Sequence, residues 1–521
     1  MARQLAWFWL TLGTMVVLAA SCSSSDSKTT PTGVMPDIGG DAASGAAPAS
    51  GGSVGDEGGA GATPGASGTP GVVTGGQAAG GDASSEMTDS WLSGTRLRAV
   101  VQVAGGIKLF SGWHDSELDI DCQWQFDPDG TERCVPRNVD GYLSYSDAKC
   151  TKLVAVVNST LPVPAWLPEP NGFKCNQGPA YRTIGASVTV TDLYYPDSSG
   201  ACMPTGPVDV NHVTKTVGAI VPGSTFVAAT KTVREARDAR LSATVRVAAD
   251  GSREVTSHLD LERQVACSPR EHAGDGMACV PLNRAYLQSL FANATCDAPA
   301  AYYPGYGQAC GKAPDIIQES KAWFTDNYFE VGKDVTGSVY GQQPTCKPYV
   351  PEFEPNATFF AVGKSIAWAS LAQLSTKNEG AGQIALRVTR GADDELITRE
   401  AFFDTKLDSV CRENVTSDLK TRCAPSAPFQ VDDFADDKCT QGLFGYTAGV
   451  APIAQTAFVQ APAAGGGTTL FKRGAKVATP AKVWHASWPD CTEAPPTAGV
   501  DYYATTTIPP SDMVLLTIET E

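Results

Sequence analysis

The chain has 521 residues, of which 56 are acidic and 39 basic, and its formal net charge at pH 7 is −17. This length leaves room for several domains, each with a buried core. Because a dispersed acidic surface repels the phosphate backbone, nucleic acid is excluded as an expected partner.

Residues 1–21 predict a bacterial lipoprotein signal peptide. Arg3 precedes an apolar stretch from Leu5 to Leu18, and small residues follow. The stretch "LAASCSSS" places Cys22 where such a peptide is cut and the new N-terminal cysteine is acylated. The alternatives are ordinary cleavage, with Cys22 as a thiol, or an uncleaved anchor. The serines after Cys22 resemble the pattern sent to the outer membrane, so the chain is expected there, lipid-anchored, facing the periplasm or the cell surface.

Residues 22–92 form a tether rich in Gly, Ala, Ser, Thr and Pro. With almost no aromatic or large aliphatic side chains, this segment cannot bury enough apolar surface to offset the entropy of ordering. It is expected to be a flexible stalk between the anchor and the body.

Three repeats of about 145 residues make up the body. The segments "CQWQFDPDGTERCVP", "CSPREHAGDGMACVP" and "CRENVTSDLKTRCAP" start at Cys122, Cys267 and Cys411, and later cysteines recur at the same intervals. Such a period is typical of tandem structural units. The predicted repeats span residues 93–237, 238–381 and 382–521.

Each repeat opens with an alternating apolar segment that predicts a half-buried strand. "RLRAVVQV" places Leu97, Ala99 and Val101 on one face, and "RLSATVRV" and "QIALRV" follow the same pattern. Helical periodicity is nearly absent, and residues 282–291 are the best short candidate. The expected class is all-β, either one β-propeller built from the three repeats or three β-sandwich or barrel modules in line.

The cysteines predict a disulfide framework, because 14 remain besides Cys22 in a chain with an export signal. No C-x-x-C motif is present, and the spacings do not suit zinc. Each repeat should close a hairpin, and the two remaining cysteines of repeat three should pair, with equivalent pairs in the other repeats. The alternative joins Cys150 to Cys175 and Cys296 to Cys310. The expected hairpin pairs are Cys122–Cys134, Cys267–Cys279 and Cys411–Cys423; the expected second pairs are Cys150–Cys202, Cys296–Cys346 and Cys439–Cys491; Cys175 and Cys310 could then bridge repeats one and two.

Carboxylates recur in register, which raises the question of calcium. Asp115, Asp260 and Asp404 each lie seven residues before the first hairpin cysteine. A calcium or carbohydrate subsite in every repeat is one interpretation, and a turn stabilised by bonds from side chain to backbone is the other. The turn is favoured, and no metal is expected. The same choice, with the same answer, applies to the loop Asp127–Glu132 and to the set Asp147, Asn293 and Asp436.

No catalytic residue or cofactor is predicted. The histidines His114, His212, His258, His272 and His485 form no recognisable zinc or nucleophile pattern. Aromatic segments at 301–307, 322–329 and 482–488 could stack sugar rings, although aromatic residues of a β protein's core are the commoner interpretation.

The lipoprotein signal, the tether and the repeats together resemble uncharacterised secreted lipoproteins of the myxobacterial type. The residues that carry the resemblance are "FDPDGTERCVP", "YLSYSDAKCT", "AFFDTKLDSVC" and "FADDKCT". The resemblance implies export and lipidation and supplies no catalytic residue.

The leading hypothesis is a lipid-anchored envelope protein that binds or scaffolds at the cell surface, with an envelope glycan or a protein as ligand. The alternative is a secreted hydrolase acting on glycans or peptides. An enzyme should carry one polar, pocket-lining cluster in a single repeat, whereas a scaffold should show equivalent surfaces in all three.

Overall fold

The computed structural model describes the body of the chain and none of residues 1–89, so Cys22, the signal peptide and nearly all of the predicted tether lie outside the described residues. The described residues consist of β-strands, 3₁₀ turns and connecting segments, which confirms the all-β class. None of their helices is long and apolar enough to cross a membrane. The described ranges are 90–137, 139–169, 176–197, 200–234, 240–272, 275–304, 312–321, 326–342, 345–349, 357–392, 396–447, 456–463, 465–487 and 490–521.

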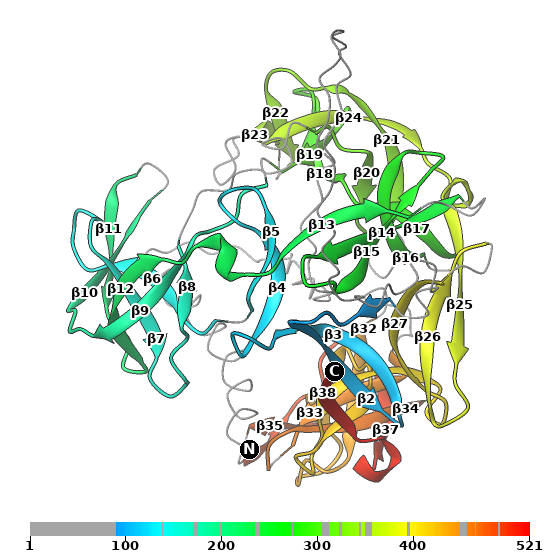
Figure 1. Cartoon of the computed structure of the whole chain (residues 1–521). Helices are drawn as coiled ribbons and strands as arrows, with labels where there is room; N and C mark the ends of the chain where they lie inside the picture. Colours follow the sequence, from blue (N-terminus) through cyan, green and yellow to red (C-terminus); the bar gives the residue numbers. More distant parts are fainter. Residues whose placement is uncertain are drawn as a thin grey trace, which may run out of the picture. The chain divides into compact units, whose positions relative to one another are not determined.

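One large sheet runs through all three repeats (Figure 1). Every repeat contributes four consecutive antiparallel strands, and its hairpin cysteines lie on the third and fourth of them. The strands are β2 (Leu97–Ala104), β3 (Ile107–Asp115), β4 (Ile120–Phe126) and β5 (Glu132–Pro136); β14 (Leu241–Ala248), β15 (Arg253–Asp260), β16 (Val265–His272) and β17 (Gly276–Pro281); and β26 (Ile384–Arg390), β27 (Leu396–Asp404), β28 (Ser409–Val415) and β29 (Thr421–Pro425).

Three further strands join these sets into a closed ring. β13 (Ala228–Val233) pairs with both β5 and β14, and β25 (Ala372–Glu379) pairs with both β17 and β26. β38 (Leu516–Thr520) pairs with β2, and beside β29 the Cys423 N–H donates to the Val514 carbonyl at 2.9 Å. Figure 1 shows β38 beside β2. The ring therefore has no unpaired edge at the junction of repeats one and three.

Between its fourth strand and its joining strand, each repeat inserts a further sheet. The first inserted sheet belongs to a compact unit of its own, and the other two belong to the unit that contains the ring. A 3₁₀ turn precedes each joining strand: η2 (Gly223–Thr225), η3 (Trp368–Ser370) and η5 (Pro510–Asp512). In spatial order the first sheet is β11 (Cys202–Pro207), β10 (Asp192–Pro196), β6 (Tyr142–Tyr145), β7 (Leu153–Asn158), β12 (His212–Ile220), β9 (Tyr181–Ser187) and β8 (Trp166–Pro168).

The second and third inserted sheets have the same general size. The second is, in spatial order, β19 (Pro299–Tyr303), β24 (Thr358–Ser365), β21 (Asn327–Asp334), β20 (Ile316–Glu319), β18 (Arg284–Phe291), β22 (Val339–Gln342) and β23 (Cys346–Tyr349). The third is β30 (Phe429–Gln430), β33 (Phe458–Pro462), β34 (Thr468–Val477), β37 (Val500–Ile508), β32 (Gly442–Thr447), β31 (Asp433–Phe434), β35 (Val483–Ser487) and β36 (Asp490–Ala494).

The alternating segments fold as their pattern predicts. Leu97, Ala99 and Val101 are fully buried on one face of β2, where they pack against the disulfide of Cys122 and Cys134. Equivalent clusters surround the hairpin disulfides of the other two repeats. Each hairpin disulfide is thus part of a hydrophobic core and not a bond at the surface.

Two expectations differ from what is observed. The continuous ring does not show the separate four-stranded blades of a propeller, and its shared strands do not leave three modules in line. Residues 282–291 contain strand β18 instead of a helix. Its residues Arg284–Tyr286 pair with β20 and Tyr286 and Leu287 with β19, so tertiary pairing overrides the local pattern.

Candidate functional site

The disulfides follow the spacing of the repeats. The hairpin bonds join Cys122 to Cys134, Cys267 to Cys279 and Cys411 to Cys423. The second bonds join Cys150 to Cys202, Cys296 to Cys346 and Cys439 to Cys491, which leaves no place for the alternative Cys150–Cys175 and Cys296–Cys310 pairs. Cys175 and Cys310 themselves lie outside the described residues.

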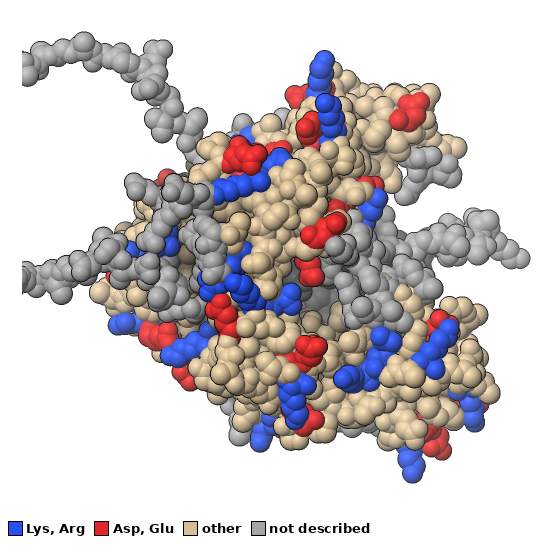
Figure 2. Space-filling view, turned by 90° about the vertical axis from the view of Figure 1, so that its right-hand side faces the viewer, with Lys and Arg blue, Asp and Glu red and all other residues tan. Residues whose placement is uncertain are grey.

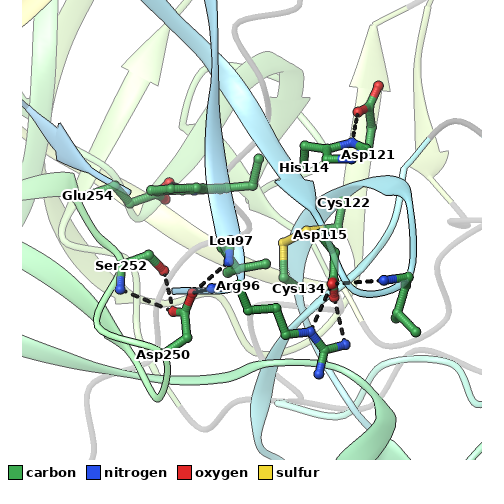
Figure 3. The surroundings of a disulfide bond; sticks show 12 residues. Arg96, Leu97, His114, Asp115, Asp121, Cys122, Cys134, Asp250, Ser252 and Glu254 are labelled. Atoms are coloured by element: carbon green, nitrogen blue, oxygen red, sulfur yellow. Dashed lines mark hydrogen bonds and ion pairs between the residues drawn. A yellow bond between two sulfur atoms is a disulfide. The ribbon is translucent and has the colours of Figure 1, made fainter. Parts of the chain in front are cut away.

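The recurrent Asp115 is a structural clamp (Figure 3). Arg96 donates from Nε and Nη2 to the two carboxylate oxygens of Asp115, each at 2.8 Å. Asp115 is fully buried and also accepts the backbone N–H groups of Glu117 and Leu118. Arg96 Nη2 further donates to the Thr225 carbonyl at 2.7 Å. The Arg96–Asp115 pair thereby ties the opening of β2, the turn after β3 and the turn η2 together.

The same clamp recurs in the other repeats. Arg240 donates to both oxygens of Asp260 at 3.0 and 2.9 Å and to the Ser370 carbonyl of η3 at 3.0 Å. In repeat three Gln383 takes the place of arginine, donating to Asp404 at 3.0 Å and to the Asp512 carbonyl of η5 at 2.8 Å.

The clamp gives the recurrence of the three acids a structural reason. Asp115, Asp260 and Asp404 are all completely buried, and each accepts two backbone N–H groups besides its side-chain donor. Asp115 and Asp260 thus accept four hydrogen bonds each and Asp404 accepts three, so most of their acceptor sites are used within the chain. In the described part of the chain, no group of three or more His, Cys, Asp or Glu side chains is arranged to hold a metal ion.

The hairpin loop between Cys122 and Cys134 is a turn. Gly130 has φ +81° and donates its N–H to the Asp127 carbonyl at 2.9 Å. Asp127 and Asp129 both contact Arg133, at 3.1 and 3.0 Å. The Thr131 backbone N–H, with the Arg133 side chain, lowers the pKa of Asp129. These contacts use the two acids within the loop, as expected of a turn.

Asp147, Asn293 and Asp436 also stabilise turns. Asp147 accepts the N–H groups of Thr151 and Lys152 at 2.9 and 2.8 Å, and the other two make equivalent bonds. The cysteine that follows each of them by three residues has φ near +50°. The side chain therefore holds the strained turn from which the second disulfide starts.

The histidines do not come together. His114, His212 and His485 have exposed or partly exposed side chains, and each lies next to an aspartate. His272 lies 2.8 Å from Asp275. His258 is buried at 4 % exposure. Within the described ranges, no two of them share a site with a nucleophile.

The aromatic residues described in these segments pack against cores, while residues 305–307, 322–325 and 488 lie outside the described residues. Tyr303 is 3 % exposed and packs edge-on to Phe360. Tyr328 is 4 % exposed. Trp484 packs against a buried cluster while the ammonium of Lys482 lies 4.7 Å from its ring centroid. These side chains are not presented as a sugar-stacking platform.

A buried charge cluster lies at the junction between repeats one and two. Arg246 pairs with Glu132 at 2.5 Å and with Glu254, and the Trp113 indole donates to Glu254. Lys231 completes the cluster, 3.2 Å from Glu132. Burial raises the pKa of Glu254. Burial also opposes the charge on Glu132, but the hydrogen bond and positive charge of Arg246 outweigh it and lower that pKa.

Sequence reasoning missed this cluster because its members are far apart in the chain. The strand register places Leu109 and Thr398 at the positions equivalent to Glu254, and Leu109 packs against the core around the hairpin disulfide of repeat three. The cluster is thus asymmetric, but each of its charges is paired within it. The cluster therefore stabilises the junction between repeats one and two and has no free charge to bind a substrate.

A shallow hollow of about 570 Å³ lies near the ends of β25 and β38. Trp91, Ile107 and Leu386 supply apolar surface, and Lys108, Glu379 and Glu521 supply charge. Glu521 pairs with Lys108, and Glu379 pairs with Arg390 at 2.7 Å. Both carboxylates are thereby neutralised by a basic partner.

The arginine site, which we define as Arg270, Arg284, Gln318, Tyr328 and Trp368, has unused polar atoms. Ala278, opposite Arg270, and Ile316, opposite Arg284, belong to one core cluster with Tyr328, against which Trp368 packs. The Arg284 Nε, Trp368 Nε1 and Gln318 Oε1 atoms are buried without a hydrogen-bond partner among the described residues. Burial, and after it the charge of Arg270, lowers the pKa of Arg284. Two buried donors and one buried acceptor of this site thus lack a hydrogen-bond partner among the described residues.

This site stands out from the charge pattern of the surface. Figure 2 shows one face of the molecule, on which basic side chains are interspersed with acidic ones and no extended field of one sign forms. Sequence reasoning could have noted only that Arg270 and Arg284 have Gln125 and Val139 as their counterparts in repeat one, at equal distance from the hairpin cysteines, and Asn414 and Pro428 in repeat three.

Comparison with known proteins identifies one family. The model of a family of unknown function, DUF7481, matches residues 81–202 and 341–519, together more than half of the chain. No curated protein and no solved structure matches.

Proposed function

The chain belongs to the DUF7481 family, whose function is unknown, and we propose that it is a lipid-anchored envelope protein of the outer membrane that binds or scaffolds at the cell surface without catalysis. The resemblance to secreted lipoproteins of the myxobacterial type, the signal peptide and Cys22 support the anchor. The disulfides support an extracellular or envelope location, because such bonds persist in oxidising compartments.

One observation carries the non-catalytic part of the proposal. The acids that recur in all three repeats, Asp115, Asp260 and Asp404, are buried and bonded to their own chain. Chemistry built on them would require breaking the ring. The repeats would therefore act through their exposed surfaces. The ligand of such a surface would be an envelope glycan or a protein.

Anchoring is tested by expressing the full chain in a Gram-negative host with labelled palmitate. The wild-type chain should incorporate label and fractionate with the outer membrane, whereas Cys22→Ala should remain unlabelled and be released in soluble form. Equal behaviour of the two chains would contradict the anchor.

Binding is tested with the purified full-length chain and isolated envelope glycans. We expect retention of the chain on the glycan fraction with no increase in reducing ends. The appearance of new reducing ends, abolished by heat denaturation of the chain, would favour the hydrolase instead.

A further inference from the structure

We propose that the arginine site binds an oxyanion carried by a hydroxylated ligand, a sugar acid or sugar phosphate, with Arg270 and Arg284 as its two cationic contacts. This inference rests on the proposed binding function and names the chemistry of its ligand.

The arginine site contains buried polar atoms without hydrogen-bond partners, which is energetically unfavourable. Buried polar groups in native proteins nearly always have a hydrogen-bond partner, because an unpaired group loses its hydrogen bonds to water and gains none within the protein. The Arg284 Nε and Trp368 Nε1 donors are both buried and have no partner among the described residues. An acceptor from outside the chain would satisfy both.

Arg284 differs from other arginines whose side chains are buried or partly buried. Arg96, Arg240 and Arg246 each pair with a carboxylate of this chain. Arg284 makes no hydrogen bond or ion pair with any described residue, and the like charge of Arg270 acts on it more strongly than the opposite charge of Asp326. The exposed Arg270 and the partly buried Arg284 together suit one oxyanion, because each planar guanidinium group can donate two parallel N–H bonds to its oxygens.

The other polar side chains of the site indicate the rest of the ligand. Gln318 lies opposite Tyr328, and its Nε2 donates to Asp326 at 2.5 Å, which fixes the amide with Oε1 pointing elsewhere. That Oε1 is a buried acceptor without a partner among the described residues, so it calls for a ligand donor such as a hydroxyl. Burial raises the pKa of Tyr328 to about 12, so its hydroxyl keeps its proton and remains a donor. Sugar acids and sugar phosphates carry an oxyanion and hydroxyl groups together.

The experiment measures binding to the purified full-length chain by calorimetry at low ionic strength. The probes are inorganic phosphate, galacturonate oligomers and neutral glucose oligomers of the same length. We expect binding of phosphate, of galacturonate or of both, weakening as salt is raised, and none of the neutral oligomer. Phosphate binding would identify the oxyanion alone as sufficient, and galacturonate binding alone would identify the carboxylate on a sugar.

Three variants locate the binding. Arg270→Gln and Arg284→Met should each weaken it by about tenfold or more, the loss expected for a charge-assisted hydrogen bond. Arg253→Gln, an exposed arginine outside the site, should bind as the wild type does. Arg284→Met should also melt at a higher temperature than the wild type without ligand, because it removes an unpaired buried charge.

A lower melting temperature of ligand-free Arg284→Met, equal binding by all variants, or no binding of either anion would overturn the inference. This failure is distinguishable from failure of the proposed function. If Arg270→Gln is retained on envelope glycans as the wild type is, the function stands and the site is wrong. If anions bind but the chain is not retained on the envelope or releases reducing ends, the site stands and the function is wrong.

Discussion

His258 should make the protein acid-sensitive, because it places a titratable ring where its counterparts are apolar. His258 on β15 lies opposite Ala243 and Cys267. Trp113 and Phe402 occupy the equivalent positions beside Cys122 and Cys411. His258 is 4 % exposed, and its Nε2 atom has no hydrogen-bond partner among the described residues.

Burial lowers the pKa of His258 to about 4 from the ordinary value of 6.5. Above pH 6.5 the ring is neutral in both the folded and the unfolded chain, and titration contributes nothing. As the pH falls below 6.5, His258 becomes protonated in the unfolded chain but stays neutral in the folded chain. The free energy of unfolding therefore falls until pH 4, by about 3 kcal/mol in total at ~1.4 kcal/mol for each pH unit.

The assay compares urea unfolding of the wild type and of His258→Phe, followed by tryptophan fluorescence from pH 7.5 to pH 4. The variant copies the residue of repeat three, and the difference between the two chains cancels the titration of carboxylates. We expect His258→Phe to gain relative stability steadily below pH 6.5. Parallel acid curves for wild type and His258→Phe would refute the reasoning.

Two further predictions concern the ring. Asp115→Ala should lower the free energy of unfolding by about 3 kcal/mol, because it removes two charge-assisted hydrogen bonds of Arg96, which keeps Glu117 and the Thr225 carbonyl as partners, whereas Asp404→Ala, whose side-chain partner is a neutral glutamine, should cost about 1 kcal/mol; equal losses in thermal or urea melts would contradict this. Glu254→Leu should destabilise the junction of repeats one and two by leaving Arg246 with one fewer acid, and adding Arg246→Thr, Glu132→Met and Lys231→Thr, the residues of the next junction, should restore most of the loss. Additive losses in the quadruple variant, measured by the same melts, would show that these side chains do not act as a unit.

Much of the local structure could be predicted from residues close together in the chain. Alternation in "RLRAVVQV" predicts β2, because side chains of a strand point alternately to its two faces. The constant spacing of cysteines in three copies predicts the disulfides, since equivalent residues of a repeat occupy equivalent places. The prediction that Asp147 stabilises a turn is likewise confirmed by the hydrogen bonds that it accepts from the backbone of Thr151 and Lys152.

Contacts between distant residues could not be predicted in this way. The recurrence of Asp115 is visible in the sequence, but its partner Arg96 and the Thr225 carbonyl meet it only after the ring has formed. The arginine site is a stronger case. Arg284 lies in a segment that looks helical, and Arg270 is 14 residues away on another strand.

The sequence by itself determined the all-β class, the repeats, the disulfide spacing and the turns, because each of these depends on side-chain alternation, backbone preference or distance along the chain. Only the tertiary structure decided how the repeats share strands, that β38 closes the ring on β2, and which charges lack partners among the described residues. Those features depend on which distant strands pair and on how much water each polar atom loses. Strand pairing and burial are properties of the whole fold.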